Sequence, residues 1–176
     1  NGTTNFTLSD VVESPEVYYL LLDKKTDNKI PFFGEKGEIT INTKLDKFSF
    51  AAKISGSKNQ SLLDTHKEML QKFNGKQLDL LKEKFEAQRN GDTALYSKIE
   101  KEENSLIKRK FYYTTNFAIN NGDYEVAPYI ALTDLYYANL QLLDTINNSL
   151  SKKVKTSKYG IELDKFIEDI KENDEQ

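Results

Sequence analysis

The stretch Ile54-Ser55-Gly56-Ser57-Lys58-Asn59-Gln60 marks a change in how hydrophobic residues are spaced along this chain. Before it, apolar side chains recur at every second position, which is typical of β-strands. After it, they recur at every third or fourth position, which is typical of helices. Ser57 and Gln60 match the Ser-x-x-Gln capping box that begins many helices. We therefore expect an α+β protein with an antiparallel β subdomain over residues 1–56 and a helical subdomain over residues 57–176.

The β subdomain is predicted from short runs of β-forming residues separated by turn-forming residues. The expected strands are Phe6–Leu8, Val17–Leu22, Ile30–Phe33, Glu38–Thr43 and Phe48–Ile54, and the expected turns include Thr26–Lys29. Val17–Leu22 lacks alternation, which predicts a strand buried on both faces. In the last strand, Phe48, Phe50, Ala52 and Ile54 are expected to share one face. The connections are short enough for hairpins, so the pattern predicts an antiparallel β-meander.

The helical subdomain is predicted to begin with two long helices that form an antiparallel hairpin. Asn90-Gly91 separates them, and Asp92 is expected to cap the second. Asp123 and Ser157 are expected to cap later helices, which gives a bundle of about four to five helices followed by a polar tail from Lys171. The residues expected to be largely buried are Phe73, Phe85, Phe117, Leu143, Leu163 and Phe166.

Composition excludes several classes of function. With 38% hydrophobic residues, 30% charged residues and a net charge of −3, the chain has an ordinary globular composition, and no nucleic-acid partner is expected. There is no cysteine, so the chain itself can neither exchange disulfides nor ligate a metal through thiolates. No apolar run approaches the ~20 residues of a membrane-spanning helix, so no transmembrane segment is expected.

No motif in the sequence assembles a catalytic site. His66 is the only histidine, and it lies on the apolar side of the first predicted helix, where a packed side chain is a better interpretation than a metal ligand or a base. The acidic run Glu100-Lys101-Glu102-Glu103 is interpreted as a solvated helix face with helix-spaced ion pairs. We therefore predict no catalytic, metal-ligating or cofactor-binding residues, no cofactor and no enzymatic activity.

Three tyrosine doublets occur in the chain, at Tyr18-Tyr19, Tyr112-Tyr113 and Tyr136-Tyr137. Each is expected to place one ring in the core and the other nearer the surface. Core and boundary packing explains such residues most simply. The alternative is an aromatic interface or a sugar-stacking surface, for which the candidate residues are Tyr19, Tyr112 and Tyr136.

The order of several short motifs resembles a known family. These motifs are Asn1-Gly2 followed by Phe6 and Leu8, then Pro15–Leu20, Phe32–Glu35, Gly37–Ile41, Ile54–Ser57, Val126–Tyr129 and Val154–Gly160. In this order they resemble the uncharacterised N-terminal domain that precedes the TlpA/ResA-like thioredoxin domain in many exported Bacteroidetes proteins. The resemblance spans nearly the whole chain. It implies a periplasmic or cell-surface protein, often lipid-anchored, with an appended thioredoxin-like domain or another protein as its partner.

Two features of that family are not found in this chain. One is a further β-hairpin upstream of the position matching Gly2. The other is the thioredoxin domain with its Cys-x-x-Cys motif, so the resemblance supplies no catalytic residue. Without the hairpin, a strand near Phe6 is expected to have an exposed edge, which predicts either pairing between copies or a mobile N-terminus.

Three functional hypotheses follow from the sequence and the resemblance. The first is a non-catalytic accessory or binding module of a cell-envelope protein, associated with a thioredoxin-like thiol-disulfide oxidoreductase. The second is an independent envelope protein that binds a glycan or peptide through its tyrosines. The third is an enzyme of unrecognised type, which a polar pocket with converging Glu, His and Tyr side chains would favour.

Overall fold

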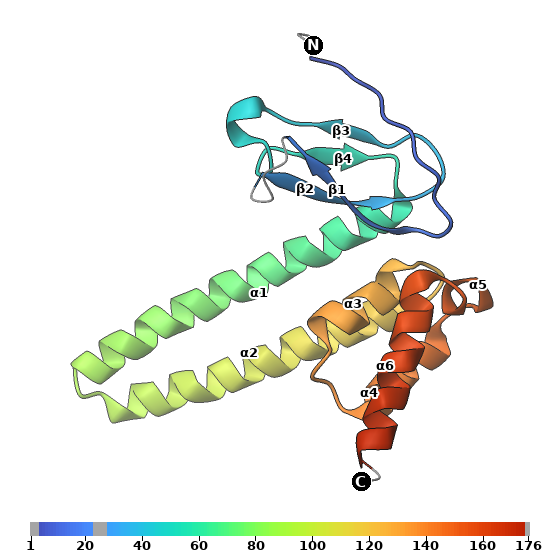
Figure 1. Cartoon of the computed structure of the whole chain (residues 1–176). Helices are drawn as coiled ribbons and strands as arrows, with labels where there is room; N and C mark the ends of the chain where they lie inside the picture. Colours follow the sequence, from blue (N-terminus) through green and yellow to red (C-terminus); the bar gives the residue numbers. More distant parts are fainter. Residues whose placement is uncertain (1–3, 23–27, 175–176) are drawn as a thin grey trace. The chain divides into compact units, whose positions relative to one another are not determined.

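The computed structural model describes residues 4–22 and 28–174 (Figure 1). The chain folds as two compact units, a strand unit over Asn1–Ser57 and a helical unit over Lys58–Gln176, and each is described by itself. The strands precede the helices in the sequence, so the predicted α+β class is confirmed.

The strand unit contains two separate antiparallel pairs. Strand β1 (Glu16–Leu21) pairs with β2 (Lys29–Gly34), with Tyr18 opposite Phe32. Strand β3 (Thr40–Asn42) pairs with β4 (Lys53–Ser55), with Ile41 opposite Ile54. The predicted antiparallel pairing is confirmed, but within the described residues the strands are divided between two sheets of two strands each.

The first strands differ from the prediction in their burial. Phe33 and Ile30 of β2 are buried, but Tyr19 and Leu21 of β1 are exposed, so β1 is not buried on both faces. Phe6–Leu8 is exposed and does not form a strand. The expected strand edge near Phe6 is therefore wrong in its location. The alternative prediction of a mobile N-terminus falls outside the described residues. So do the first two residues of the turn predicted at Thr26–Lys29.

The predicted strand at Phe48–Ile54 forms only at its end. A 3-10 helix, η1 (Leu45–Lys47), precedes it, and the amide of Ala51 donates to the carbonyl of Lys47 at 2.8 Å. Phe48 is consequently buried while Phe50 is 96% exposed. Local hydrogen bonds between residues three to five positions apart replace the strand ladder here, which the alternating pattern cannot reveal.

Gly56 joins the two units of structure. Its φ of 98° lies in the left-handed region, and a Cβ at this position would contact the backbone of Glu38. Helix α1 (Lys58–Arg89) begins directly after Ser57, so the position predicted for the cap immediately precedes the helix.

We expect Gly56→Ala to destabilise the strand unit by ~2 kcal/mol, because it adds both backbone strain and a steric conflict. Amide hydrogen exchange of β3 and β4 measures this effect. Unchanged exchange in Gly56→Ala would contradict the prediction.

Ser57→Ala should lower the stability of the start of α1 by ~1 kcal/mol, as expected for the loss of a capping hydroxyl. Chemical unfolding followed by circular dichroism measures this loss. An unfolding midpoint that is the same in Ser57→Ala and in the unmodified chain would argue against the cap.

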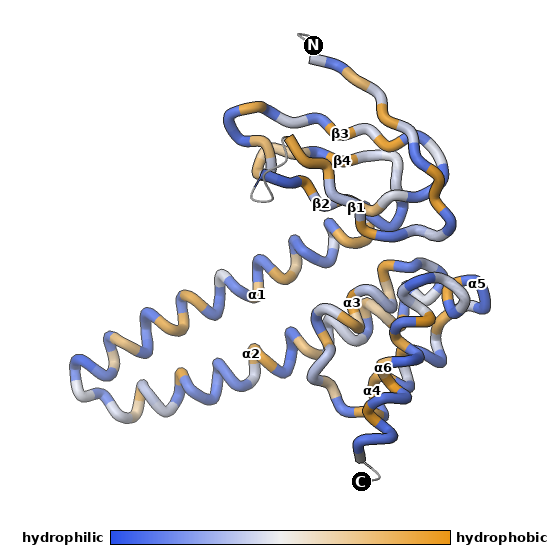
Figure 2. Tube along the Cα trace, in the orientation of Figure 1, coloured by the Kyte–Doolittle hydropathy of each residue, from blue (hydrophilic) through white to orange (hydrophobic). Residues whose placement is uncertain are grey.

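The two long helices form the predicted antiparallel hairpin (Figure 1). Helix α1 continues through Asn74-Gly75 and ends before Gly91, whose φ is 70°. The second helix, α2 (Thr93–Asn120), is capped as predicted by Asp92, whose Oδ1 accepts a hydrogen bond from the Leu95 amide at 2.9 Å. Figure 2 shows hydrophobic residues recurring along both helices between hydrophilic ones. The hairpin is thus specified locally by its turn and its caps.

Four further helices complete the helical unit within the described residues. They are α3 (Val126–Asp134), α4 (Leu140–Ser149), α5 (Lys152–Lys155) and α6 (Lys158–Asp174). Ser157 accepts from the Gly160 amide at 3.4 Å, as expected for the cap of α6. Helix α6 continues past Lys171 to Asp174, so the predicted polar tail is exposed at Lys171–Asn173 but is part of the helix. None of the helices in the described ranges is both long and apolar enough to cross a membrane.

The helical unit has a main core and a smaller seam. The main core joins the end of α2 to α3–α6, and its buried residues are Ala118, Ala127, Ala131, Leu135, Leu143, Ile146, Leu150, Val154, Leu163 and Ile167. The seam lies between α1 and α2 and contains Leu80, Ala87, Ile99 and Leu106. Leu143 and Leu163 are buried as predicted. Phe73, Phe117 and Phe166 are partly buried, and Phe85, at 63% exposed, contradicts the prediction.

Candidate functional site

Four aromatic residues gather on one exposed region of the helical unit, which we call the aromatic surface. Phe111 and Tyr112 come from α2, and Tyr136 and Tyr137 from the connection between α3 and α4. The Phe111 ring centroid lies 6.1 Å from that of Tyr112 and 6.3 Å from that of Tyr137, and the Tyr136 and Tyr137 centroids are 5.3 Å apart. The three tyrosines are 62–66% exposed. Large rings in contact with both solvent and one another form a surface suited to binding.

The aromatic surface is anchored to the main core on both sides. Phe111 is partly buried and packs against that core. Leu135, directly before Tyr136, is buried, and its carbonyl accepts from the Ala138 amide at 2.8 Å. Asn139 then caps α4 by accepting from the Leu142 amide at 2.9 Å. Tyr136 and Tyr137 therefore lie in a short turn held between a core residue and a helix cap.

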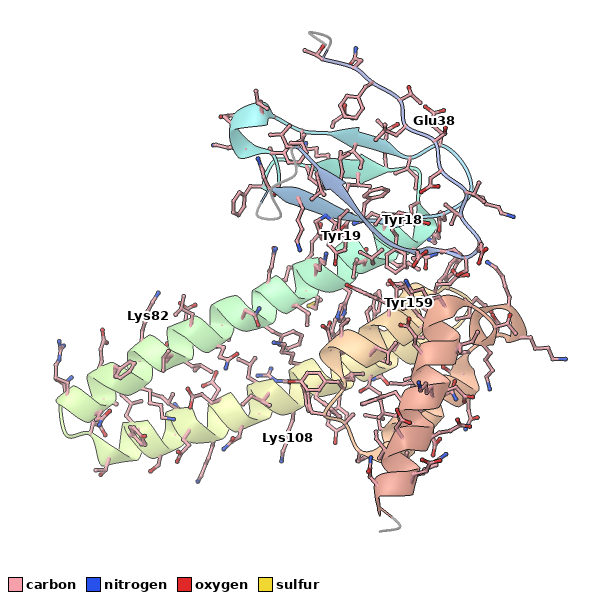
Figure 3. The ribbon with its side chains drawn as sticks, viewed as in Figure 1. Tyr18, Tyr19, Glu38, Lys82, Lys108 and Tyr159 are labelled. Atoms are coloured by element: carbon pink, nitrogen blue, oxygen red, sulfur yellow. The ribbon has the colours of Figure 1, made fainter. Side chains whose placement is uncertain are left out.

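The structure brings two of the three predicted surface residues together. Tyr112 and Tyr136 belong to the aromatic surface, whereas Tyr19 lies in the strand unit, with the Lys29 ammonium 4.7 Å from its ring centroid (Figure 3). The expectation of one inner and one outer ring holds for Tyr112-Tyr113 but fails for Tyr136-Tyr137. Both of these are exposed because they lie in a turn and not on a two-faced element. Sequence reasoning missed Phe111 and Tyr137, although Tyr137 lay within a conspicuous doublet.

His66 is enclosed in the helical unit, as expected for a packed side chain. Its Nε2 lies 2.8 Å from Oδ2 of Asp134, which links α1 to the end of α3. The ring stacks on Tyr113 with an interplanar angle of 6° and also contacts Phe117. The side chain is only 1% exposed, and Nδ1 has no hydrogen-bond partner. This geometry makes a buried tie between helices and leaves no imidazole nitrogen accessible to a substrate.

A second polar tie holds the beginning of α3. The Oδ1 atom of Asn59, from α1, accepts from the Val126 amide at 2.8 Å, and its Nδ2 donates to Oε2 of Glu125 at 2.9 Å. The Lys153 ammonium lies 3.2 Å from Oε1 of the buried Glu125. The prediction that Asp123 caps this helix is therefore wrong. Asn59, which is distant in the sequence, occupies the capping role, since α3 begins three residues after Asp123.

The acidic run of α2 pairs across the hairpin and not along its own helix. Lys84 of α1 lies 2.6 Å from Glu103 and 3.9 Å from Glu100, and Lys76 lies 3.5 Å from Glu102. The hydrogen bond from Lys84 to Glu103 raises the pKa of the Lys84 ammonium, so it stays protonated at neutral pH. The helix-spaced pairing expected for this run is wrong, because the facing helix supplies the lysines.

Few of these groups offer reactive chemistry. Burial raises the pKa of the Tyr113 phenol, which keeps it neutral beside His66. Across residues 4–22 and 28–174, no three His, Asp or Glu side chains lie close enough to hold a metal ion. The aromatic surface is exposed and is held by packing against the main core and by the cap of α4.

Comparisons with known proteins concern mainly the strand unit. Residues 1–63 match the model of a family described as a domain of unknown function, DUF4369. The match includes the whole strand unit and the first residues of α1. Searches of curated proteins and of solved structures found no significant match.

Proposed function

We propose that this chain is a non-catalytic binding module of an exported cell-envelope protein, and that it recognises a protein partner through the aromatic surface. The observation that carries this proposal is the exposure of three clustered tyrosines, one on α2 and two in the connection between α3 and α4. Aromatic side chains are enriched at protein interfaces because they bury much area for little conformational entropy.

The non-catalytic part of the proposal is supported by where the reactive groups lie. The chain has no cysteine, and its single histidine is buried against Asp134. A general base must come within hydrogen-bonding reach of the proton it removes, and the enclosed His66 does not meet that condition in this structure. The function left for the accessible surface is recognition.

The cellular context is the part of the proposal supported by sequence. The motif order resembles the domain that precedes TlpA/ResA-like thioredoxin domains, whereas the family matched by residues 1–63 is of unknown function and adds neither a compartment nor a partner. On this basis the module is periplasmic or at the cell surface, and it positions a thioredoxin-like oxidoreductase or recognises its client proteins. The neighbouring domain would supply the thiol chemistry that this chain lacks.

The test joins a TlpA-like thioredoxin domain after Gln176 and measures reduction of disulfide-bonded periplasmic proteins by thiol release. We expect the joined module to lower KM about tenfold relative to the thioredoxin domain alone, which corresponds to ~1.4 kcal/mol of client binding. The triple variant Tyr112→Ser/Tyr136→Ser/Tyr137→Ser should remove that gain and leave kcat unchanged, because it removes recognition and not chemistry.

Phe85→Ser is the matched control, because Phe85 is equally exposed but lies outside the aromatic surface, near the end of α1. It should keep the low KM. If the triple variant and the unmodified module give the same KM, or if the module has no effect on KM, the proposal is wrong. Catalysis by the isolated chain that a single Glu or His66 substitution abolishes would overturn its non-catalytic part.

A further inference from the structure

The outward face of α2 carries charges of one sign. Lys98, Lys101, Ser105, Lys108 and Tyr112 follow one another at steps of three and four residues, so they form one line along the helix. All five are exposed, and Arg109 lies beside the line. Figure 3 shows Lys108 pointing away from α1. We call Lys98, Lys101, Lys108 and Arg109 the basic stripe.

The acidic residues of α2 are paired with α1, although Glu102 lies one turn after Lys98 on the same side of the helix. Glu103, Glu100 and Glu102 all come within ion-pair distance of lysines on α1. The four cations of the basic stripe, by contrast, have no ion-pair partner among residues 4–22 and 28–174. The glutamates of α2 therefore pair with lysines of α1, and within the described part of the chain the cations of the basic stripe remain unpaired on the outward face.

The basic stripe leads into the aromatic surface. From Lys98 to Tyr112 the helix rises by about 21 Å at ~1.5 Å per residue. Two carboxylates of the neighbouring elements are already engaged, Asp134 by His66 and Asp144 by Lys171 at 3.0 Å. One continuous surface thus has free cations along its length and exposed tyrosines at one end.

We propose that this surface binds an acidic peptide segment of a partner protein, whose carboxylates lie along the basic stripe and whose apolar side chain packs on the tyrosines. This proposal rests on the proposed function and specifies its partner. Complementary charge speeds encounter and selects among partners, while the buried rings supply most of the affinity. A segment of six or seven extended residues spans the ~21 Å of the stripe at about 3.3 Å per residue.

A peptide fits this surface better than a nucleic acid does. The chain as a whole carries a net charge of −3, which repels a long polyanion, whereas a short segment meets only the local positive charge. The tyrosines at one end also call for a ligand that combines carboxylates with an apolar group. Neutral glycans would use the tyrosines but gain nothing from the cations.

The experiment selects binding sequences from a random displayed peptide library on the full chain. Enriched peptides should contain clustered Asp and Glu next to an aromatic or large aliphatic residue. For the best peptide, Lys101→Gln/Lys108→Gln/Arg109→Gln should weaken binding about tenfold, as three rim ion pairs of ~0.5 kcal/mol each would predict. The control variant Lys67→Gln/Lys72→Gln/Lys165→Gln makes the same change in net charge on other exposed faces and should bind normally.

Salt provides a second readout. Binding to the unmodified chain should weaken between 50 and 500 mM NaCl, and this dependence should largely disappear in the stripe variant, because salt screens exposed charges. Peptides that need the tyrosines but show no acidic preference would overturn this inference and leave the proposed function standing. Peptides indifferent to the tyrosine triple variant, or no enrichment at all, would count against both. Tyrosine-dependent binding of neutral oligosaccharides, or tighter binding of a single-stranded oligonucleotide than of any peptide, would also overturn it.

Discussion

Replacing Leu163 with alanine is expected to lower the free energy of unfolding by ~3 kcal/mol, whereas Phe85→Ala should change it by less than ~0.5 kcal/mol. Leu163 is fully buried in the main core of the helical unit, so truncation removes its packing and leaves a cavity among α3, α4 and α6. Phe85 is the larger side chain, but it is 63% exposed and its removal uncovers little.

Guanidinium unfolding followed by circular dichroism at 222 nm measures both variants, since that signal reports the helices. Leu143→Ala serves as a second core variant and should resemble Leu163→Ala. A larger loss of stability in Phe85→Ala than in Leu163→Ala would mean that the helix phases described above are incorrect.

Phe85 also shows that a sequence pattern can predict a helix without predicting which of its faces is buried. Apolar residues at steps of three and four predicted α1 correctly as a helix, but its distal half contacts only α2. Because α2 is the one described helix that covers this half of α1, it buries only a narrow stripe of its surface. Of two apolar residues on adjacent sides of α1, only one is therefore buried. The structure buries Leu80 and Ala87, and the small side chain of Ala87 lies at the seam. The spacing alone cannot distinguish this phase from one that buries Phe85. In the main core several helices surround each element, and there the predictions of Leu143 and Leu163 were confirmed.

Asn59→Ala is expected to lower the stability of the helical unit by ~3 kcal/mol, although it removes only a small polar side chain. The substitution leaves the Val126 amide without its acceptor and takes one donor from the buried Glu125 carboxylate. A buried group left without a partner costs about 1–3 kcal/mol, and more when it is charged. Thermal or chemical unfolding by circular dichroism measures the loss.

Two comparisons separate this tie from general helix effects. Asn104→Ala makes the same change at an exposed position of α2 and should leave stability within ~0.5 kcal/mol of the unmodified chain. In Asn59→Ala/Glu125→Gln the removal of the buried charge should recover part of the loss, because a buried carboxylate left with Lys153 as its partner costs more than a neutral amide. Equal stability of Asn59→Ala and Asn104→Ala would show that the tie contributes nothing.

The polar ties could not have been predicted from the sequence. Asn59 and Glu125, and likewise His66 and Asp134, are more than 60 positions apart and meet only once α3 packs on α1. Asp123 was predicted as the cap because capping rules consider adjacent residues, and here a residue from another helix takes that role. The aromatic surface was partly predictable, since the Tyr136-Tyr137 doublet is conspicuous. Its contact with Phe111 depends on the tertiary fold.

The α1–α2 hairpin has a consequence for how such chains can differ in size. Beyond the contacts with α3, the two helices are joined by the seam of Leu80, Ala87, Ile99 and Leu106 and by the ion pairs that Lys76 and Lys84 make with α2. Removing or inserting seven residues in each helix preserves the facing stripe and moves the tip by about 10 Å, since each residue contributes ~1.5 Å. The hairpin is thus an adjustable spacer whose reach can change by whole pairs of turns without disturbing the main core.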